Sequence, residues 1–129
     1  MTDSSTFYER VGGQPFFETL TRRFYEGVAG DPVLRPLYPD DDEGFEASRI
    51  HLELFLIQYW GGPPTYNATR GAPRLRMRHA PFPIGPAERD AWLMHMTEAV
   101  RRADLSPLDE VQLLGYLTTS AEHLMNRPD

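Results

Sequence analysis

One basic segment, residues 73–82 with the sequence PRLRMRHAPF, organises the interpretation of the whole chain. Three arginines alternate with apolar residues ahead of His79, and Pro81 follows shortly after it. Because proline cannot continue a helix and disfavours helical geometry in the residue before it, His79 is predicted on the last turn of a short helix or just past it. A histidine in that place can serve as a metal ligand, a catalytic base or an ordinary surface residue.

The composition indicates one acidic, folded domain. A chain of 129 residues has the length of one domain and can bury a proper core, so residues 1–129 are expected to form one unit. Apolar residues make up 40% and aromatic residues 12%, which argues against disorder. The net charge of -6 gives no general attraction to nucleic acid or anionic membranes, although all 13 basic residues are arginine.

Several classes of site are excluded because the chain contains no cysteine. Disulfides, thiolate zinc sites, cysteine-bound iron–sulfur clusters and cysteine nucleophiles all require one. The N-terminal residues lack a basic region followed by an apolar one, so no signal peptide is expected, and no apolar run is long enough to span a bilayer. A cytoplasmic location is the expectation that fits these features.

Apolar residues at helical spacing predict four substantial helices. The first covers residues 15–29, follows a short helix around Phe7, and precedes a single turn at residues 33–34. The third starts near Pro86, and the fourth covers roughly residues 107–126. No alternating strand pattern and no internal repeat is present, so the predicted fold class is all-α.

The second helix, residues 45–60, carries two apolar stripes. Phe55 belongs to one stripe, and the other consists of Ile50, Leu54 and Ile57. The helix is therefore predicted to be central and buried on two sides. Residues 61–73 follow as a long loop rich in glycine and proline. A loop of that length in a compact domain is usually functional, and this one leads directly into the basic segment.

The other histidines form no recognisable metal motif. His51, His95 and His123 are widely spaced, without His-Glu-x-x-His or Glu-x-x-His, and are interpreted as surface or helix-face residues. No hydrolase, Walker or dinucleotide motif occurs. A single-histidine site needs a cofactor that supplies the other ligands, as haem does, and anionic propionates would favour nearby arginines. Haem ligation and a surface role for His79 both stay open on these grounds.

Short stretches spread along the chain match one protein family. They are residues 7–13 (FYERVGG), 23–25 (RFY), 37–39 (LYP), 58–63 (QYWGGP), 74–82 (RLRMRHAPF) and 88–93 (ERDAWL). In this order and combination they resemble the truncated haemoglobins of group II, the O type. The resemblance covers nearly the whole chain. It implies a two-over-two helical sandwich, the truncated globin fold, around one haem b with its iron.

The resemblance also assigns roles to particular residues. It implies that His79 is the proximal iron ligand, across the haem from polar donors that can hydrogen-bond a diatomic ligand. The distal residues would be Tyr25, Tyr38, Trp92, Ser48 and Leu52. The haem contacts would be Phe55, Leu56, Tyr66, Arg76, Arg78, Phe82 and Met96. No distal histidine is implied, because His51 should point elsewhere or lie at the pocket edge.

Each of these roles has a simpler alternative. Tyr25 and Tyr38 can be ordinary core tyrosines whose hydroxyls reach water, and Trp92 can simply fill the core. Arg76 and Arg78 can belong to a solvated basic face rather than contact a propionate. The apolar haem contacts would be core residues under either interpretation.

The expected function is a haem protein that binds oxygen, nitric oxide and carbon monoxide. Tight holding by the distal donors would suit redox chemistry, detoxification or sensing better than bulk oxygen delivery. A peroxidase-like or nitric-oxide-detoxifying enzyme of the same fold is the first alternative. It would take peroxide as substrate, or need a separate reductase, because the chain has no flavin or nicotinamide motif. A non-haem helical interaction module is the second alternative.

Overall fold

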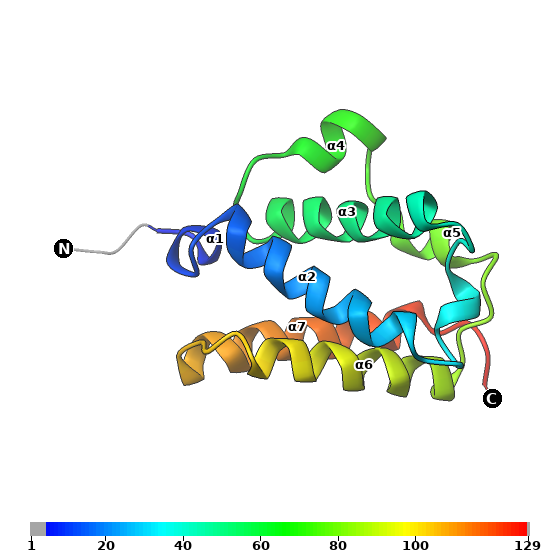
Figure 1. Cartoon of the computed structure of the whole chain (residues 1–129). Helices are drawn as coiled ribbons and strands as arrows, with labels where there is room; N and C mark the ends of the chain where they lie inside the picture. Colours follow the sequence, from blue (N-terminus) through cyan, green and yellow to red (C-terminus); the bar gives the residue numbers. More distant parts are fainter. Residues whose placement is uncertain (1–4, 129) are drawn as a thin grey trace.

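Four long helices form two layers in the computed structural model, which describes residues 5–128 (Figure 1). The elements in chain order are α1 (Phe7–Arg10), α2 (Gln14–Ala29), the 3-10 turn η1 (Arg35–Leu37), α3 (Asp42–Tyr59), α4 (Thr65–Arg70), α5 (Leu75–His79), α6 (Pro86–Arg101) and α7 (Pro107–Leu124). No strand occurs among residues 5–128, and none of their helices is long and apolar enough to cross a membrane. The all-α prediction is confirmed.

The layers pair α2 with α3 and α6 with α7, and α2 packs across α6 to join them (Figure 1). This is the two-over-two arrangement that the resemblance implies. The core lies where the helices meet, and its fully buried side chains include Phe17, Phe24, Met96 and Leu113. Burial of one such side chain stabilises the fold by about 1.5–3 kcal/mol.

Helix α3 starts earlier than residue 45, where apolar spacing placed it. The Asp41 carboxylate accepts a hydrogen bond from the Gly44 backbone N–H at 2.9 Å and caps the helix. Asp42 and Glu43 then occupy the first turn, where the helix dipole favours negative charge. Acidic residues therefore extend the helix at a point where apolar periodicity gives no signal.

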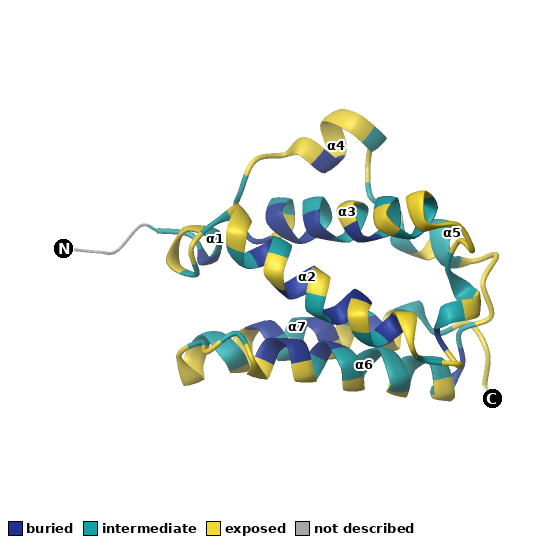
Figure 2. Cartoon of the chain, viewed as in Figure 1, coloured by how far each residue is buried: buried dark blue, intermediate teal, exposed yellow. Residues whose placement is uncertain are grey.

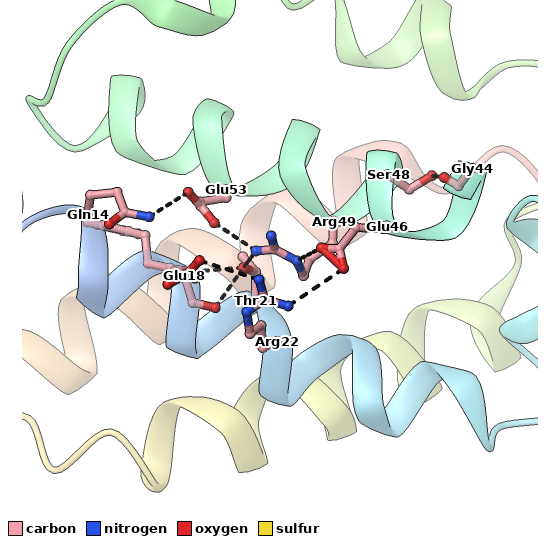
Figure 3. A network of polar contacts seen from close by, with 10 residues as sticks. Gln14, Glu18, Thr21, Arg22, Gly44, Glu46, Ser48, Arg49 and Glu53 are labelled. Atoms are coloured by element: carbon pink, nitrogen blue, oxygen red, sulfur yellow. Dashed lines mark hydrogen bonds and ion pairs between the residues drawn. The ribbon is translucent and has the colours of Figure 1, made fainter. Parts of the chain in front are cut away.

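The prediction that α3 is apolar on two sides is wrong. Ile57 of the second stripe is buried, but Ile50 is 39% exposed and Leu54 is only half-buried. Arg49 and Glu53, by contrast, are 5% and 7% exposed. Figure 3 shows these two side chains lying between α2 and α3, where Arg49 also meets Thr21 of α2. Charged side chains can be buried there because they satisfy one another.

The prediction of an unbroken loop over residues 61–73 is also wrong, because α4 occupies its middle. The Gln58 side chain accepts a hydrogen bond from the Asn67 backbone N–H and donates one to the Asn67 side chain, each at 2.9 Å. Tyr66 is 3% exposed and packs edge-on against Phe55. These contacts fix a six-residue helix that is too short to be stable alone.

The last helix ends at Leu124, short of the predicted residue 126, because Asn126 leaves it to bind the segment before α6. The Asn126 side chain accepts a hydrogen bond from the Ile84 backbone N–H at 2.9 Å. It also donates to the Phe82 and His79 carbonyl oxygens, at 2.8 Å and 3.3 Å. The C-terminal end of the described chain thus holds the residues that follow α5.

Candidate functional site

A mostly apolar cavity of about 390 Å³ lies between the two helical layers and is closed on one side by α5. Its volume falls in the range of about 300–1,000 Å³ that is usual for small-molecule and cofactor pockets. The predicted site residues that line it are His79, Tyr25, Tyr38, Trp92, Ser48, Leu52, Phe55, Leu56, Tyr66, Arg78 and Phe82. The fold therefore brings together residues that are widely separated in sequence.

His79 lies on the last turn of α5, as predicted, and its ring is oriented by its own helix. Nδ1 lies 2.7 Å from the Leu75 carbonyl oxygen, one turn earlier. A carbonyl oxygen only accepts, so Nδ1 carries the proton and donates it. The neutral imidazole then has its lone pair on Nε2, the form in which histidine binds metals. Because His79 lines the cavity, Nε2 can bind the metal of a cofactor held there.

Arginine–carbonyl hydrogen bonds hold the segment around α5. Arg78 donates through Nε to the Pro73 carbonyl oxygen at 2.7 Å and through Nη2 to the Arg70 carbonyl oxygen at 2.9 Å. Arg74, the residue before α5, has a left-handed backbone with φ 43°. A non-glycine residue there costs about 1–2 kcal/mol, which the surrounding hydrogen bonds must offset.

Tyr25 and Tyr38 meet on the opposite side of the cavity, although they come from α2 and from the residue after η1. Their ring centroids are 5.4 Å apart, and their hydroxyls are hydrogen bonded to each other. Burial and the contact with Tyr38 raise the pKa of Tyr25 far above its ordinary value. Burial raises the pKa of Tyr38 to about 12, while the hydrogen bond from Tyr25 opposes that rise. Both groups therefore stay protonated near neutral pH.

Trp92, Ser48 and Leu52 also line this side of the cavity. The Trp92 ring packs edge-on against Phe24 of the core, with centroids 5.4 Å apart. The Ser48 hydroxyl donates to the Gly44 carbonyl oxygen at 3.1 Å within α3, so its proton is directed to its own helix. Tryptophan and tyrosine side chains are thus the polar donors that the cavity offers on this side.

Two predicted haem contacts lie elsewhere. Arg76 is exposed, does not line the cavity, and donates through Nε to the His123 carbonyl oxygen at 3.2 Å. It belongs to an outer groove because its side chain leaves α5 on the side away from Arg78. Met96 is fully buried in the core between the layers and does not reach the cavity wall.

Sequence reasoning missed Arg70 at the rim of the cavity, whereas His51 lies at the pocket edge, one of the two positions expected for it. Arg70 Nη1 lies 3.1 Å from His51 Nε2, and both residues line the cavity beside Arg78. Burial, followed by the positive charges of Arg70 and Arg78, lowers the pKa of His51. His51 is four residues before Phe55, a spacing that could have placed it on the cavity face. Arg70 gave no such signal, because α4 was not predicted.

Arg70 has an unsatisfied polar atom at this rim. Its Nε is buried and has no hydrogen-bond partner in the structure. The Arg70 and Arg78 guanidinium carbons both lie within 6 Å of the Tyr66 ring centroid, at 5.7 and 5.9 Å. A buried donor without an acceptor costs about 1–3 kcal/mol, and an anionic group at the cavity mouth would remove that cost.

The comparisons with known proteins agree with the fold and the cavity. A family model described as bacterial-like globin matches residues 6–126. Group 2 truncated hemoglobin YjbI of Bacillus subtilis (strain 168) is 39% identical, over 95% of this chain and 89% of that protein. The X-ray structure of a thermostable hemoglobin from Thermobifida fusca is 55% identical, with a TM-score of 0.92 over 97% of this chain and 100% of that one.

A second similar structure is that of the truncated oxygen-avid haemoglobin from Bacillus subtilis, which is 38% identical, with a TM-score of 0.87 over 95% of this chain and 100% of that one. Fold, cavity and matches define a globin, and the chain belongs to the bacterial-like globin family. Within it the chain is a truncated haemoglobin of group II, as the resemblance predicts. Globins of this kind carry haem and bind diatomic gases such as oxygen.

The residues of the cavity fit haem. The wall formed by α5 offers a histidine whose Nε2 is free, and the cavity is mostly apolar. The rim offers Arg78 and the unpartnered Nε of Arg70, which suit the two anionic propionates of haem. Among residues 5–128 no group of three or more His, Asp or Glu side chains could hold a metal ion by itself.

Proposed function

We propose that His79 holds haem iron and that this protein binds oxygen, nitric oxide and carbon monoxide, with Tyr25, Tyr38 and Trp92 as the distal hydrogen-bond donors. The observation that carries the proposal is the placement of these residues around one cavity. His79 presents a free Nε2 from α5, and the three donors approach from α2, from the residue after η1 and from α6. When bound, haem supplies the iron to which the diatomic ligand attaches.

The protein's own part is to hold the ligand by hydrogen bonds. The Tyr25 and Tyr38 hydroxyls interact with each other, so Tyr25 can support Tyr38 while Tyr38 donates its proton into the cavity. The indole N–H of Trp92 can only donate, which suits a ligand that has gained negative charge. These donors are preorganised by core packing, so little side-chain entropy is lost when the ligand binds. Slow release is the expected result, and it suits redox chemistry or sensing better than bulk delivery.

The test is oxygen release from haem-loaded protein after Tyr38→Phe. Loss of one hydrogen bond of about 1.4 kcal/mol accelerates release about tenfold. Tyr25→Phe should have a smaller effect because Tyr25 acts through Tyr38. Tyr8→Phe is the matched control, since Tyr8 does not line the cavity and stacks on Phe17. Unchanged release in both Tyr38→Phe and Trp92→Phe would exclude the proposed network.

The same donors support a second candidate, a peroxidase-like activity. A site with O–H and N–H donors opposite the cofactor ligand can polarise an O–O bond as it breaks. Turnover of peroxide by the ferric protein should then exceed that of free haem and fall in Trp92→Phe. Turnover equal to that of free haem would exclude this candidate and leave ligand binding as the function.

A further inference from the structure

A second hollow lies outside the cavity, between α5 and the C-terminal part of α7. We name it the proximal groove, and its lining residues are Arg74, Leu75, Arg76, Met77, Ser120, His123 and Leu124. Leu75, Ser120 and Leu124 also line the main cavity. One layer of side chains therefore separates the groove from the cavity. A partner bound in the groove would lie close to a cofactor bound in the cavity.

The groove is basic although the protein is acidic. Residues 54–87 contain four arginines and no aspartate or glutamate, while the whole chain has a net charge of -6. Arg70 and Arg78 face the cavity rim, whereas Arg74 and Arg76 are exposed in the groove. Neither Arg74 nor Arg76 forms an ion pair with a carboxylate of residues 5–128. Their charges are therefore available to an acidic partner.

An exposed apolar side chain lines the groove together with these two charges. Met77 is 59% exposed on the outer side of α5, and Leu124 forms part of the groove wall. Methionine is flexible and polarisable, so it adapts to different partner surfaces. An apolar centre with a charged rim is the usual composition of a protein–protein contact site.

We propose that the proximal groove docks an acidic protein that donates single electrons. The proposal rests on the proposed function, because a haem protein that binds oxygen must first hold ferrous iron. In the step, the reduced partner loses one electron and ferric haem iron gains it, with no bond broken and no proton moved. Charge complementarity steers such a partner to the groove. Electron-transfer contacts are small, below about 1,200 Å², so a short groove is sufficient.

The test titrates ferric, haem-loaded protein with an oxidised plant-type [2Fe–2S] ferredoxin as the acidic probe. Binding is measured by calorimetry at low and high salt, so the readout does not depend on turnover. Arg74→Glu combined with Arg76→Glu should weaken binding about tenfold at low salt, and high salt should weaken wild-type binding similarly. The reduction rate by reduced ferredoxin should fall by the same factor.

The matched control is Arg101→Glu combined with Arg102→Glu. These exposed arginines end α6 at the opposite end of the molecule (Figure 1), and the pair changes the net charge equally. Equal weakening by both pairs, or by neither, would overturn the proposal. So would a groove variant that changes only self-association, since the occupant would then be a second copy. A wild-type protein without a Soret band would instead exclude the proposed function before any titration.

Discussion

The two walls of the cavity are built by different means. The distal wall consists of the long helices α2, α3 and α6, which pack on the core, whereas the proximal wall combines the short helices α4 and α5 with one side of α7. Figure 2 shows the contrast, since α4 is mostly exposed while α2 and α3 carry buried residues along their facing sides.

Buried charge holds the distal wall. Arg49 donates to Glu53 at 2.7 Å and to the Thr21 hydroxyl at 3.0 Å, and it also contacts Glu46 (Figure 3). Glu53 in turn accepts from Gln14 at 3.2 Å. Thr21 lies one turn before Tyr25 on α2, so the network fixes the helix that carries this distal donor. Such a network has one satisfied arrangement and therefore rigidifies its surroundings.

The two short helices of the proximal wall have no comparable core, since α5 has no buried residue and α4 has Tyr66. They are held by side chains that bind backbone carbonyl oxygens, chiefly Arg78 and Asn126. Helices as short as α4 and α5 are unstable in isolation, so these hydrogen bonds and packing against α3 and α7 have to order them. The difference teaches that core packing and buried charge fix the helices of the distal wall, whereas hydrogen bonds from side chains to backbone carbonyl oxygens fix the short helices of the proximal wall.

The largest expected effect comes from removing the proximal histidine. His79→Ala should lower haem affinity by more than about 100-fold, because loss of even an outer partner of a metal ligand costs about 10–100-fold. Stability of the haem-free protein should change little, since the distal wall does not depend on His79. Haem titration followed at the Soret band measures the first quantity, with His123→Ala as the control. Equal affinity in both variants would rule out His79 as the iron ligand.

The next effect tests the distal network. Arg49→Met should destabilise the protein by about 3–5 kcal/mol, because it leaves Glu53 buried without its cation. Arg49→Met combined with Glu53→Met should recover most of that loss. Arg22→Met, at an exposed ion pair with Glu18, should cost only about 0–1 kcal/mol. Urea denaturation measures all three, and a double variant no better than Arg49→Met would show that packing, not charge pairing, fixes this wall.

A smaller and local effect is expected at the proximal wall. Arg78→Ala removes hydrogen bonds to the Pro73 and Arg70 carbonyl oxygens and should cost about 1–3 kcal/mol. Amide hydrogen exchange should quicken in residues 65–85 while protection in α2 and α3 stays constant. Arg76→Ala, which keeps the Arg78 contacts, is the control. Exchange that quickens throughout the chain would mean that the two walls are not independent.

The smallest effect concerns His51 in haem-free protein. Its pKa is lowered by burial and by Arg70 and Arg78, so the folded state binds this proton less readily than the unfolded state. Stability should therefore fall as the pH drops below about 6.5, the ordinary value for histidine. Haem should raise the pKa by bringing propionates to the rim, and NMR titration measures both values. A His51 pKa that is unchanged by haem would place the propionates elsewhere.

The sequence alone determined the fold class, the positions of the long helices and the place of His79 at the end of a short helix. Apolar periodicity, proline and capping residues act locally, so they can be read from neighbouring positions. The family resemblance added the distal residues Tyr25, Tyr38 and Trp92, and the fold brings them to one cavity. Neither the local sequence pattern nor the family resemblance predicted that Arg49 and Glu53 are buried, because burial of a charged side chain depends on partners from another helix.

Only the tertiary structure decided which side chains lie at the cavity rim. Residues 65–70 become helical because Gln58 and Phe55 of α3 hold Asn67 and Tyr66, and that helix carries Arg70 to His51. The sequence spacing also did not determine the direction in which each arginine side chain near His79 points. Arg78 turns to the cavity and its neighbour Arg76 to the outer groove, because the carbonyl oxygens that accept from them lie on different segments. Local patterns formed the helices, and contacts between distant segments assigned their side chains to cavity or surface.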